Sequence, residues 1–133
     1  MAAAMAWRLL IHGGAGSERI AHDDPAHEAA ARRGLEHALT AGSDILSDGG
    51  SAVDAVEAAA RVLEEDPCFN AGLGSVLSAD GVAELDAAIM DGRTRRAGAV
   101  AGLTTTRAPI TLARRLMEQG PHVFLSFDGA DQR

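Results

Sequence analysis

The tetrapeptide Asp48-Gly49-Gly50-Ser51 limits the fold most, because it joins a helix stop directly to a helix start. Glycine takes the left-handed conformation that ends a helix, so the helix predicted from Pro25 ends here. The apolar stripe of that helix recurs every three or four residues and comprises Leu35, Ala38, Leu39, Gly42, Ile45 and Leu46. Ser51 begins a second helix through a capping-box pattern with Asp54, and Asp66-Pro67 ends it. The first half of the chain is therefore predicted to contain two consecutive helices.

Strand patterns lie on both sides of these helices. Residues 7–11 have the pattern of a short buried strand that stops at His12-Gly13-Gly14-Ala15-Gly16. Beyond the second helix, strands are predicted over residues 75–78, 82–85, 87–90, 97–106 and 122–126, and a helix over residues 109–118. This order predicts a mixed α/β layered fold and not a regular βαβ alternation. No repeat or linker divides the chain, so residues 1–133 are predicted to form a single domain with residues 1–6 as a disordered leader.

The apolar residues of the chain are mostly small. Hydrophobic residues make up 47% of the sequence but aromatic residues only 3%, and there are 15 glycines. Alanine and valine bury less area per side chain than phenylalanine or tryptophan, and glycine loses more backbone entropy on folding. The composition therefore favours a domain that completes its core against another polypeptide.

Charge and cysteine content argue against several classes of protein. The formal net charge is −7 and no basic cluster could neutralise a run of phosphates, so we expect no nucleic-acid partner. No basic region precedes the apolar N-terminus, and no apolar run reaches the roughly 18 residues of a membrane span, so we expect no membrane association. The single cysteine, Cys68, cannot form an internal disulfide and has the surroundings of a small buried residue. These features favour a cytoplasmic protein.

The glycine-rich segment His12-Gly13-Gly14-Ala15-Gly16 follows a predicted strand but lacks the residues of a nucleotide-binding loop. A phosphate-binding loop ends in Gly-Lys-Ser/Thr, whereas Gly16 is followed by Ser17 and Glu18. The dinucleotide fingerprint opens a helix at this point, and an acidic loop follows here instead. Two interpretations remain, a structural turn and a mobile active-site loop.

Residues 63–74 bring acids, a proline, an asparagine and two glycines together in one connection between a helix and a strand. Such a loop can turn several backbone carbonyl oxygens inward around a hard cation. An ordinary connection has the same composition, so the residues alone leave both interpretations open.

Two further patterns are explained without chemistry. Glu84, Asp86 and Asp91 are unevenly spaced and have no histidine nearby, which is typical of solvated turn acids. Thr104-Thr105-Thr106 lies inside the chain, where threonine cannot provide the free amine of an N-terminal nucleophile. Strand propensity accounts for these threonines.

Four segments of the chain resemble the plant-type L-asparaginase/isoaspartyl peptidase family. They are His12-Gly13-Gly14-Ala15-Gly16, residues 48–56, residues 63–74, and Glu84-Leu85-Asp86-Ala87-Ala88-Ile89-Met90-Asp91-Gly92. The similarity continues through residues 97–102, 109–118 and 121–123, and it keeps one register from about Leu9 to Ala130. The form Phe69-Asn70-Ala71-Gly72 is more similar to the isoaspartyl peptidase branch than to lysosomal glycosylasparaginase.

This resemblance implies an N-terminal-nucleophile (Ntn) hydrolase that is made as one precursor and cleaves itself before a threonine. The new N-terminal threonine of the β-subunit then serves as nucleophile and, through its amine, as general base. The implied fold is an αββα sandwich that a separate β-subunit completes, assembled as an (αβ)2 heterotetramer. The implied substrates are asparagine and β-aspartyl dipeptides. Because this chain corresponds to the α-subunit, the resemblance implies that it carries no catalytic residue itself.

The resemblance also implies supporting roles for residues of this chain. Asn70 is placed to hydrogen-bond near the nucleophile, and Gly13 and Gly14 match a glycine loop linked to autocleavage. A structural sodium ion is implied, with no organic cofactor. Its ligands would be the backbone carbonyls of Leu63, Glu64, Asp66, Phe69, Ala71 and Leu73.

An alternative of a different class stays open at this point. A catalytically inactive, stand-alone α-like module could serve in binding or as a scaffold. A β segment that begins with Gly-Thr, in the same gene or in the purified material, distinguishes the enzyme from that module.

Overall fold

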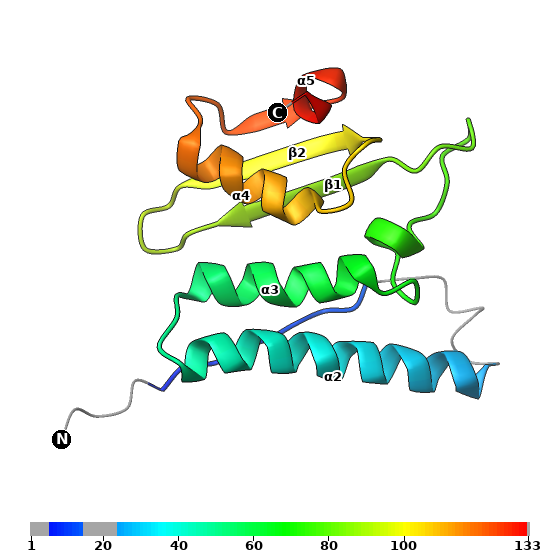
Figure 1. The fold of residues 1–133 in the computed structure, drawn as a ribbon, viewed down its shortest axis with the longest axis vertical. Coiled ribbons are helices and arrows are strands. Elements are labelled where there is room, and N and C mark those ends of the chain that lie inside the picture. The colour runs from blue at the N-terminus through cyan, green and yellow to red at the C-terminus, as the bar shows by residue number, and fades with distance from the viewer. Residues whose placement is uncertain (1–5, 15–23, 133) are drawn as a thin grey trace.

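The computed structural model describes residues 6–14 and 24–132. Two long helices, α2 (Pro25–Ser47) and α3 (Ala52–Glu65), lie side by side in the lower half of Figure 1. The buried residues of α2 are Gly34, Ala38 and Gly42, and those of α3 include Ala55 and Ala59. A Cβ atom at position 42 would lie only 3.0 Å from the Ala55 carbonyl oxygen. The small side chains therefore allow a close approach of the two helix backbones.

Both helices begin where capping chemistry predicts. The Asp24 carboxylate accepts hydrogen bonds from the Ala26 and His27 N–H groups at 2.9 and 3.2 Å. Ser51 and Asp54 form a reciprocal capping box, in which each backbone N–H donates to the other side chain. The two predicted helices and the stop between them are confirmed. No helix within the described ranges is long and apolar enough to cross a membrane.

Three strands of the described chain form one small mixed sheet in the order β1-β2-β3. β1 (Leu85–Met90) pairs antiparallel with β2 (Ala97–Leu103), and β2 pairs parallel with β3 (Phe124–Ser126). Helix α4 (Pro109–Gln119) connects β2 to β3 and covers one face of the sheet (Figure 1). A 3-10 turn, η1 (Gly72–Gly74), precedes the sheet, and a short helix, α5 (Asp128–Asp131), follows it. The predicted mixed α/β class is confirmed.

The core lies between α4 and the sheet. Its buried residues are Leu85, Ile89, Val100, Leu103, Ile110, Ala113, Met117 and Ala130. The pairing of β1 with β2 shifts register between Leu85 and Ala87, close to Gly102 with its positive φ of 65°. The Gly102 N–H donates to the Asp86 carboxylate at 2.8 Å. This irregularity turns Leu103, which is fully buried, into the core.

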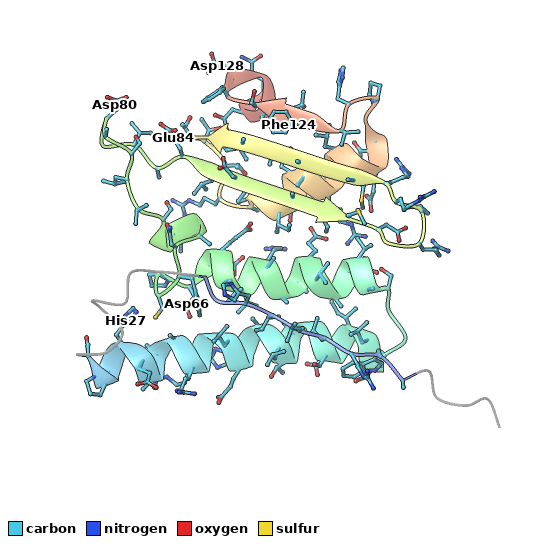
Figure 2. The ribbon with its side chains drawn as sticks, turned by 180° about the vertical axis from the view of Figure 1, so that it is seen from behind. His27, Asp66, Asp80, Glu84, Phe124 and Asp128 are labelled. Atoms are coloured by element: carbon cyan, nitrogen blue, oxygen red, sulfur yellow. The ribbon has the colours of Figure 1, made fainter. Side chains whose placement is uncertain are left out.

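The opposite face of the sheet has no covering layer among the described residues. Figure 2, which views the molecule from behind, shows the strands with no helix in front of them. Ala88 of β1 aligns with Ala99 of β2, which aligns in turn with Phe124 of β3. Phe124 is 57% exposed. This face therefore presents apolar side chains to the surroundings.

Arg114 connects α4 to α3. Its guanidinium contacts Asp54 and Glu57 of α3, each at 2.6 Å, and Glu118 of its own helix at 2.8 Å. Ion pairs that are partly shielded from water contribute more than fully exposed ones. The arrangement fixes the orientation of α4, and with it the sheet, relative to the two long helices.

Asp131 anchors the last described turn of the chain to the end of β2. Its carboxylate accepts hydrogen bonds from the backbone N–H and the hydroxyl of both Thr104 and Thr105, at 2.8 to 3.3 Å. These bonds, led by the one from the Thr104 N–H, lower the pKa of Asp131. Four donors thus hold one acidic side chain beside the sheet. No helix was predicted after residue 126, whereas residues 128–131 form α5.

The predicted strand over residues 7–11 is wrong. Within residues 6–14 no strand forms, and no backbone hydrogen bond joins this segment to another described residue. Exposure still alternates, because Leu9 and Ile11 are half-buried whereas Leu10 is 93% exposed. A Cβ atom at position 42 would lie 2.6 Å from Leu9 Cδ2, so the segment packs on α2. The alternation is that of a strand, and what it lacks is a partner strand.

The predicted strands over residues 75–78 and 82–85 are reduced to one antiparallel bridge, between Leu77 and Ala83. A tight turn joins the two segments, since Gly81 has a φ of 76° and donates its N–H to the Ser78 carbonyl at 2.9 Å. Figure 2 shows Asp80 at the tip of this projecting segment. β2 ends at Leu103 and β3 begins at Phe124, so both are shorter than predicted.

Candidate functional site

The connection that follows α3 is a compact loop anchored by Phe69. The Asp66 carboxylate accepts the Cys68 N–H at 2.9 Å, and the Asp66 carbonyl accepts the Phe69 N–H at 3.2 Å. Phe69 is buried, and its ring lies so close to Gly34 of α2 that a Cβ there would approach it to 2.5 Å. Cys68 is half-buried, and burial raises the pKa of its thiol, which disfavours the reactive thiolate. The loop is therefore held in place by packing and by local hydrogen bonds.

Two glycines of this loop pack directly against backbone carbonyls. A Cβ atom at position 72 would lie 2.1 Å from the Glu64 carbonyl oxygen, and one at position 74 would lie 2.1 Å from the Phe69 carbonyl oxygen. Gly72 also has a positive φ of 48°. The loop therefore requires glycine at both positions, because its backbone turns closely around these carbonyls.

This loop contains the carbonyls predicted to hold sodium. Three of them, those of Asp66, Phe69 and Ala71, accept loop N–H groups at 3.2, 2.8 and 3.0 Å. A carbonyl oxygen has two lone pairs, so each of the three retains one for a cation. Neutral oxygen donors suit a hard cation such as sodium, so the residues present fit the ion. The ion itself stays a prediction, as do the ligand roles of Leu63, Glu64 and Leu73.

Asn70 lies in the same loop, and a hydrogen bond within the loop fixes the orientation of its side-chain amide. Its side-chain oxygen accepts the Val76 N–H at 2.9 Å, which leaves the amide NH2 group as a donor. Asn70 lines a cavity of about 250 Å³ together with Glu64, Ser75 and Asp86. The arrangement offers a hydrogen-bond donor beside a small polar cavity, and the link of Asn70 to a nucleophile stays a prediction.

The glycine-rich segment near the N-terminus lies against this loop. A Cβ atom at position 13 would lie 3.1 Å from both the Phe69 ring and the Leu35 side chain. Gly14 has a positive φ of 101° and donates its N–H to His12 Nδ1 at 3.1 Å. Ala15 and Gly16 lie outside the described residues. The structure therefore brings Gly13 next to the Asn70 loop, while a role of Gly13 and Gly14 in autocleavage stays a prediction.

The side chain of Glu64 was not predicted from the sequence, since only its backbone carbonyl was a candidate ligand. Glu64 is 6% exposed, and its Oε1 atom accepts the Ile110 N–H at 2.9 Å. Its Oε2 atom has no hydrogen-bond partner among residues 6–14 and 24–132. Burial raises the pKa of this carboxyl to about 7, against the opposing effect of the Ile110 N–H. The signal was its spacing, four residues after the core-packed Ala60 on α3.

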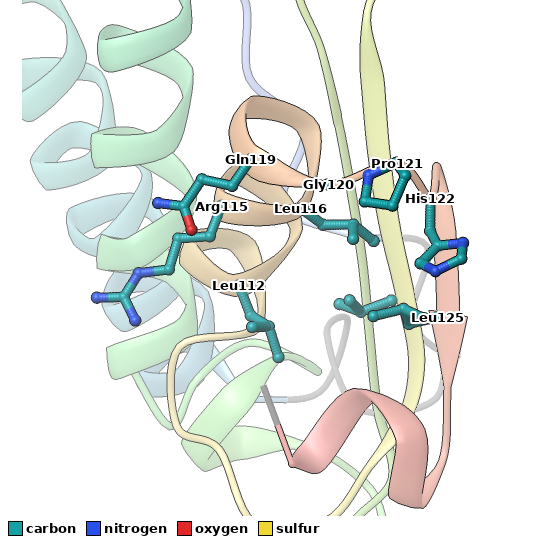
Figure 3. A pocket seen from close by; sticks show the side chains of 9 residues that line it. Leu112, Arg115, Leu116, Gln119, Gly120, Pro121, His122 and Leu125 are labelled. Carbon is teal, nitrogen blue, oxygen red and sulfur yellow. The ribbon is translucent and has the colours of Figure 1, made fainter.

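A separate cavity of about 510 Å³ lies between the end of α4 and β3. Figure 3 shows Leu116 and Leu125 facing each other across it, with Arg115 and His122 at its rim. None of the predicted site residues lines this cavity. The cavity beside Asn70 is lined at α4 by Pro109, at the opposite end of this helix.

The gathered features define the class of this chain. A glycine turn, a loop that folds around backbone carbonyls and an oriented asparagine meet in a mixed α/β chain whose sheet is open on one face. The chain belongs to the asparaginase family, whose model matches residues 5–132.

Among its relatives, the chain is similar to isoaspartyl peptidase/L-asparaginase of Rattus norvegicus, with 48% identity over 93% of this chain and 36% of the rat protein. The isoaspartyl peptidase of Salmonella typhimurium is 46% identical, over 92% of this chain and 39% of that protein. The plant-type L-asparaginase of Pyrococcus abyssi is 48% identical, over 92% of this chain and 38% of that protein. The family resemblance is thereby confirmed. The chain spans less than two fifths of the length of these three relatives.

Proposed function

We propose that this chain is the α-subunit part of an L-asparaginase/isoaspartyl peptidase, which hydrolyses the side-chain amide of asparagine and isoaspartyl peptide bonds. The observation that carries the proposal is the similarity over nine tenths of the chain to relatives whose names include one or both of these activities. The same similarity favours an enzyme over the inactive binding or scaffold module.

The proposed reaction begins with a threonine at the N-terminus of a β-subunit cut from the same precursor. Its hydroxyl attacks the side-chain acyl carbon of the aspartyl group, and its own amine takes up the proton. Ammonia or the peptide amine leaves, and water then hydrolyses the acyl-enzyme to release aspartate. Asn70 would contribute its NH2 group as a hydrogen-bond donor that positions the nucleophile or the reacting oxygen. The bound sodium ion would supply rigidity to the Asn70 loop.

Apolar side chains that no described element covers support the proposal of a partner chain. One face of the sheet exposes Ala88, Met90 and Phe124, and Leu10 projects from the extended segment that packs on α2. Large apolar side chains exposed in this way are typical of an interface. We therefore propose that a β-subunit layer completes an αββα sandwich here, in an (αβ)2 assembly.

Denaturing mass spectrometry of the natively purified protein tests the proposal directly. We expect a second chain that begins with threonine, together with ammonia release from L-asparagine and cleavage of a β-aspartyl dipeptide. A single species of about 13.7 kDa that hydrolyses neither substrate would refute the enzyme and favour the binding module.

Replacing Asn70 with aspartate tests the NH2 donor of this side chain apart from the hydrogen bond that its oxygen accepts within the loop. Aspartate keeps an acceptor for the Val76 N–H but lacks the NH2 group, whereas Asn70→Ala lacks both. We expect kcat to fall by about 100-fold in both variants, the size of a lost donor at a reacting oxygen. Only the alanine variant should also lower the melting temperature. Full turnover in both variants would remove Asn70 from the site.

A further inference from the structure

Glu64, at the end of α3, contacts the carbonyl loop through its main chain and the start of α4 through its side chain. Its main-chain carbonyl lies against Gly72, where an added Cβ would approach the oxygen to 2.1 Å. Its side chain reaches the start of α4, where Oε1 accepts the Ile110 N–H at 2.9 Å. Ala108, the residue before α4, provides no side-chain cap, so Glu64 supplies from α3 what the sequence next to α4 lacks. One residue thus links the end of α3, the carbonyl loop and α4.

The second carboxyl oxygen of Glu64 has no partner in the described part of the chain. Glu64 is more than nine tenths buried, and it lines the cavity of about 250 Å³ that Asn70, Ala71 and Gly72 also line. A buried acceptor without a partner costs about 1–3 kcal/mol, and more when it is charged. Such a group requires a compensating donor or a positive charge nearby.

The charged neighbours of Glu64 on α3 and Asp66 in the loop already have partners. Arg61 pairs with Glu65 at 3.0 Å, on the outside of α3. Glu57 is held by Arg114, and the Asp66 carboxylate accepts the Cys68 N–H. Glu64 is the buried carboxyl group of this cavity, since Glu84 and Asp86, which also line it, are exposed.

A cation bound by the loop carbonyls would supply the positive charge that the Glu64 carboxyl lacks. All six predicted sodium ligands are neutral backbone oxygens, so they carry no charge to balance a cation taken out of water. A buried cation without a counter-charge loses much of its hydration energy. We propose that Glu64 is the positioning residue of this ion site. Its carboxyl supplies the counter-charge for a monovalent cation, and its bond to Ile110 holds its own carbonyl in the ligand set. This inference rests on the sodium site of the proposed function.

The test compares Glu64→Gln with the neighbouring Glu65→Gln in the assembled protein. Both substitutions remove one negative charge, and glutamine at position 64 still offers Oε1 to the Ile110 N–H. Melting temperature is followed while sodium chloride replaces choline chloride at constant ionic strength, and sodium affinity is measured by isothermal titration. We expect sodium to stabilise the wild type and Glu65→Gln equally, and its dissociation constant to rise at least tenfold in Glu64→Gln.

An unchanged sodium response in Glu64→Gln overturns the counter-charge role, and no sodium response in the wild type overturns the ion site with it. Should Glu64→Gln fail to fold, Glu64→Asp keeps the charge on a shorter side chain. The aspartate variant keeps the counter-charge but reaches the Ile110 N–H less well, so sodium should still stabilise it with weakened affinity, and a complete loss of the sodium response there contradicts the proposal. Ammonia release from L-asparagine by the wild type is assayed in parallel, so a failure of the proposed hydrolase is recognised separately from a failure of the ion site.

Discussion

Replacing Gly98 with alanine is expected to lower the free energy of unfolding by about 3 kcal/mol, near the upper end for overpacking in a core. Gly98 lies in β2 directly beneath α4. A Cβ atom there would lie 2.1 Å from the Ala113 carbonyl oxygen and 2.6 Å from the Met117 backbone nitrogen. Both obstacles are helix backbone, which cannot move aside by changing a rotamer. The helix must therefore rise from the sheet, and the whole core between them loosens.

Gly92→Ala is the matched control for this substitution. Gly92 lies in the turn between β1 and β2, and nothing within 4 Å opposes an added Cβ. Alanine there should change stability by less than about 0.5 kcal/mol, as surface substitutions do. Urea denaturation followed by circular dichroism measures both variants side by side. Equal stability of the two would show that α4 does not rest on β2 as closely as described.

The second large effect is expected from Gly72→Ala in the carbonyl loop. A positive φ costs an alanine about 1–2 kcal/mol, and the added Cβ also meets the Glu64 carbonyl oxygen at 2.1 Å. We expect a combined loss of about 3 kcal/mol, because the strain and the collision act together. Turnover of the proposed αβ enzyme should fall at least tenfold, since Asn70 shares the displaced loop.

Gly81→Ala distinguishes the strain of a positive φ from the collision of the added Cβ with a backbone carbonyl. Gly81 also has a positive φ, 76°, but open space surrounds it. Its replacement should cost only the conformational strain, about 1–2 kcal/mol, and leave turnover unchanged. Melting temperatures and asparagine hydrolysis, measured for both variants, distinguish strain from collision. If Gly81→Ala were as inactive as Gly72→Ala, the close approach to Glu64 would not be the cause.

Local signals in the sequence predicted the helices well. Asp48-Gly49-Gly50-Ser51 acts through residues that are neighbours in the chain, so its stop and its capping box are present in the structure as predicted. Pro109 begins α4 for the same reason, because the ring of proline fits the first turn of a helix. Such features need no information from distant parts of the chain.

Strands were predicted less well, because a strand exists only through its partner. Leu9, Leu10 and Ile11 show the alternation of a strand without any ladder hydrogen bonds to described residues. The end of β2 was placed too late, since Gly102 takes a positive φ beside a register shift in the pairing with β1. Neither the partner nor the bulge follows from the local pattern.

The candidate site was predicted in part. The sequence singled out residues 63–74 and the resemblance singled out Asn70, and the structure adds that Gly13 packs against the Phe69 ring of that loop. The contact of Glu64 with Ile110 joins residues far apart in the chain, so no local pattern announces it. The function of the side chain at such a position depends on the tertiary fold.

The hydrogen bonds from Thr104 and Thr105 to Asp131 limit how far any polypeptide that continues beyond this turn can extend. Four hydrogen-bond donors fix the place from which any continuing polypeptide departs. A flexible tether extends at most about 3.5 Å per residue, and the local concentration of a group at its end falls as the tether lengthens. With its origin pinned beside β2, the number of residues in such a tether would set how often a group on it meets the Asn70 loop. The substitution Asp131→Ala would remove these hydrogen bonds. The flexible segment would then begin nearer to the end of β2, so it would be longer although no residue had been added.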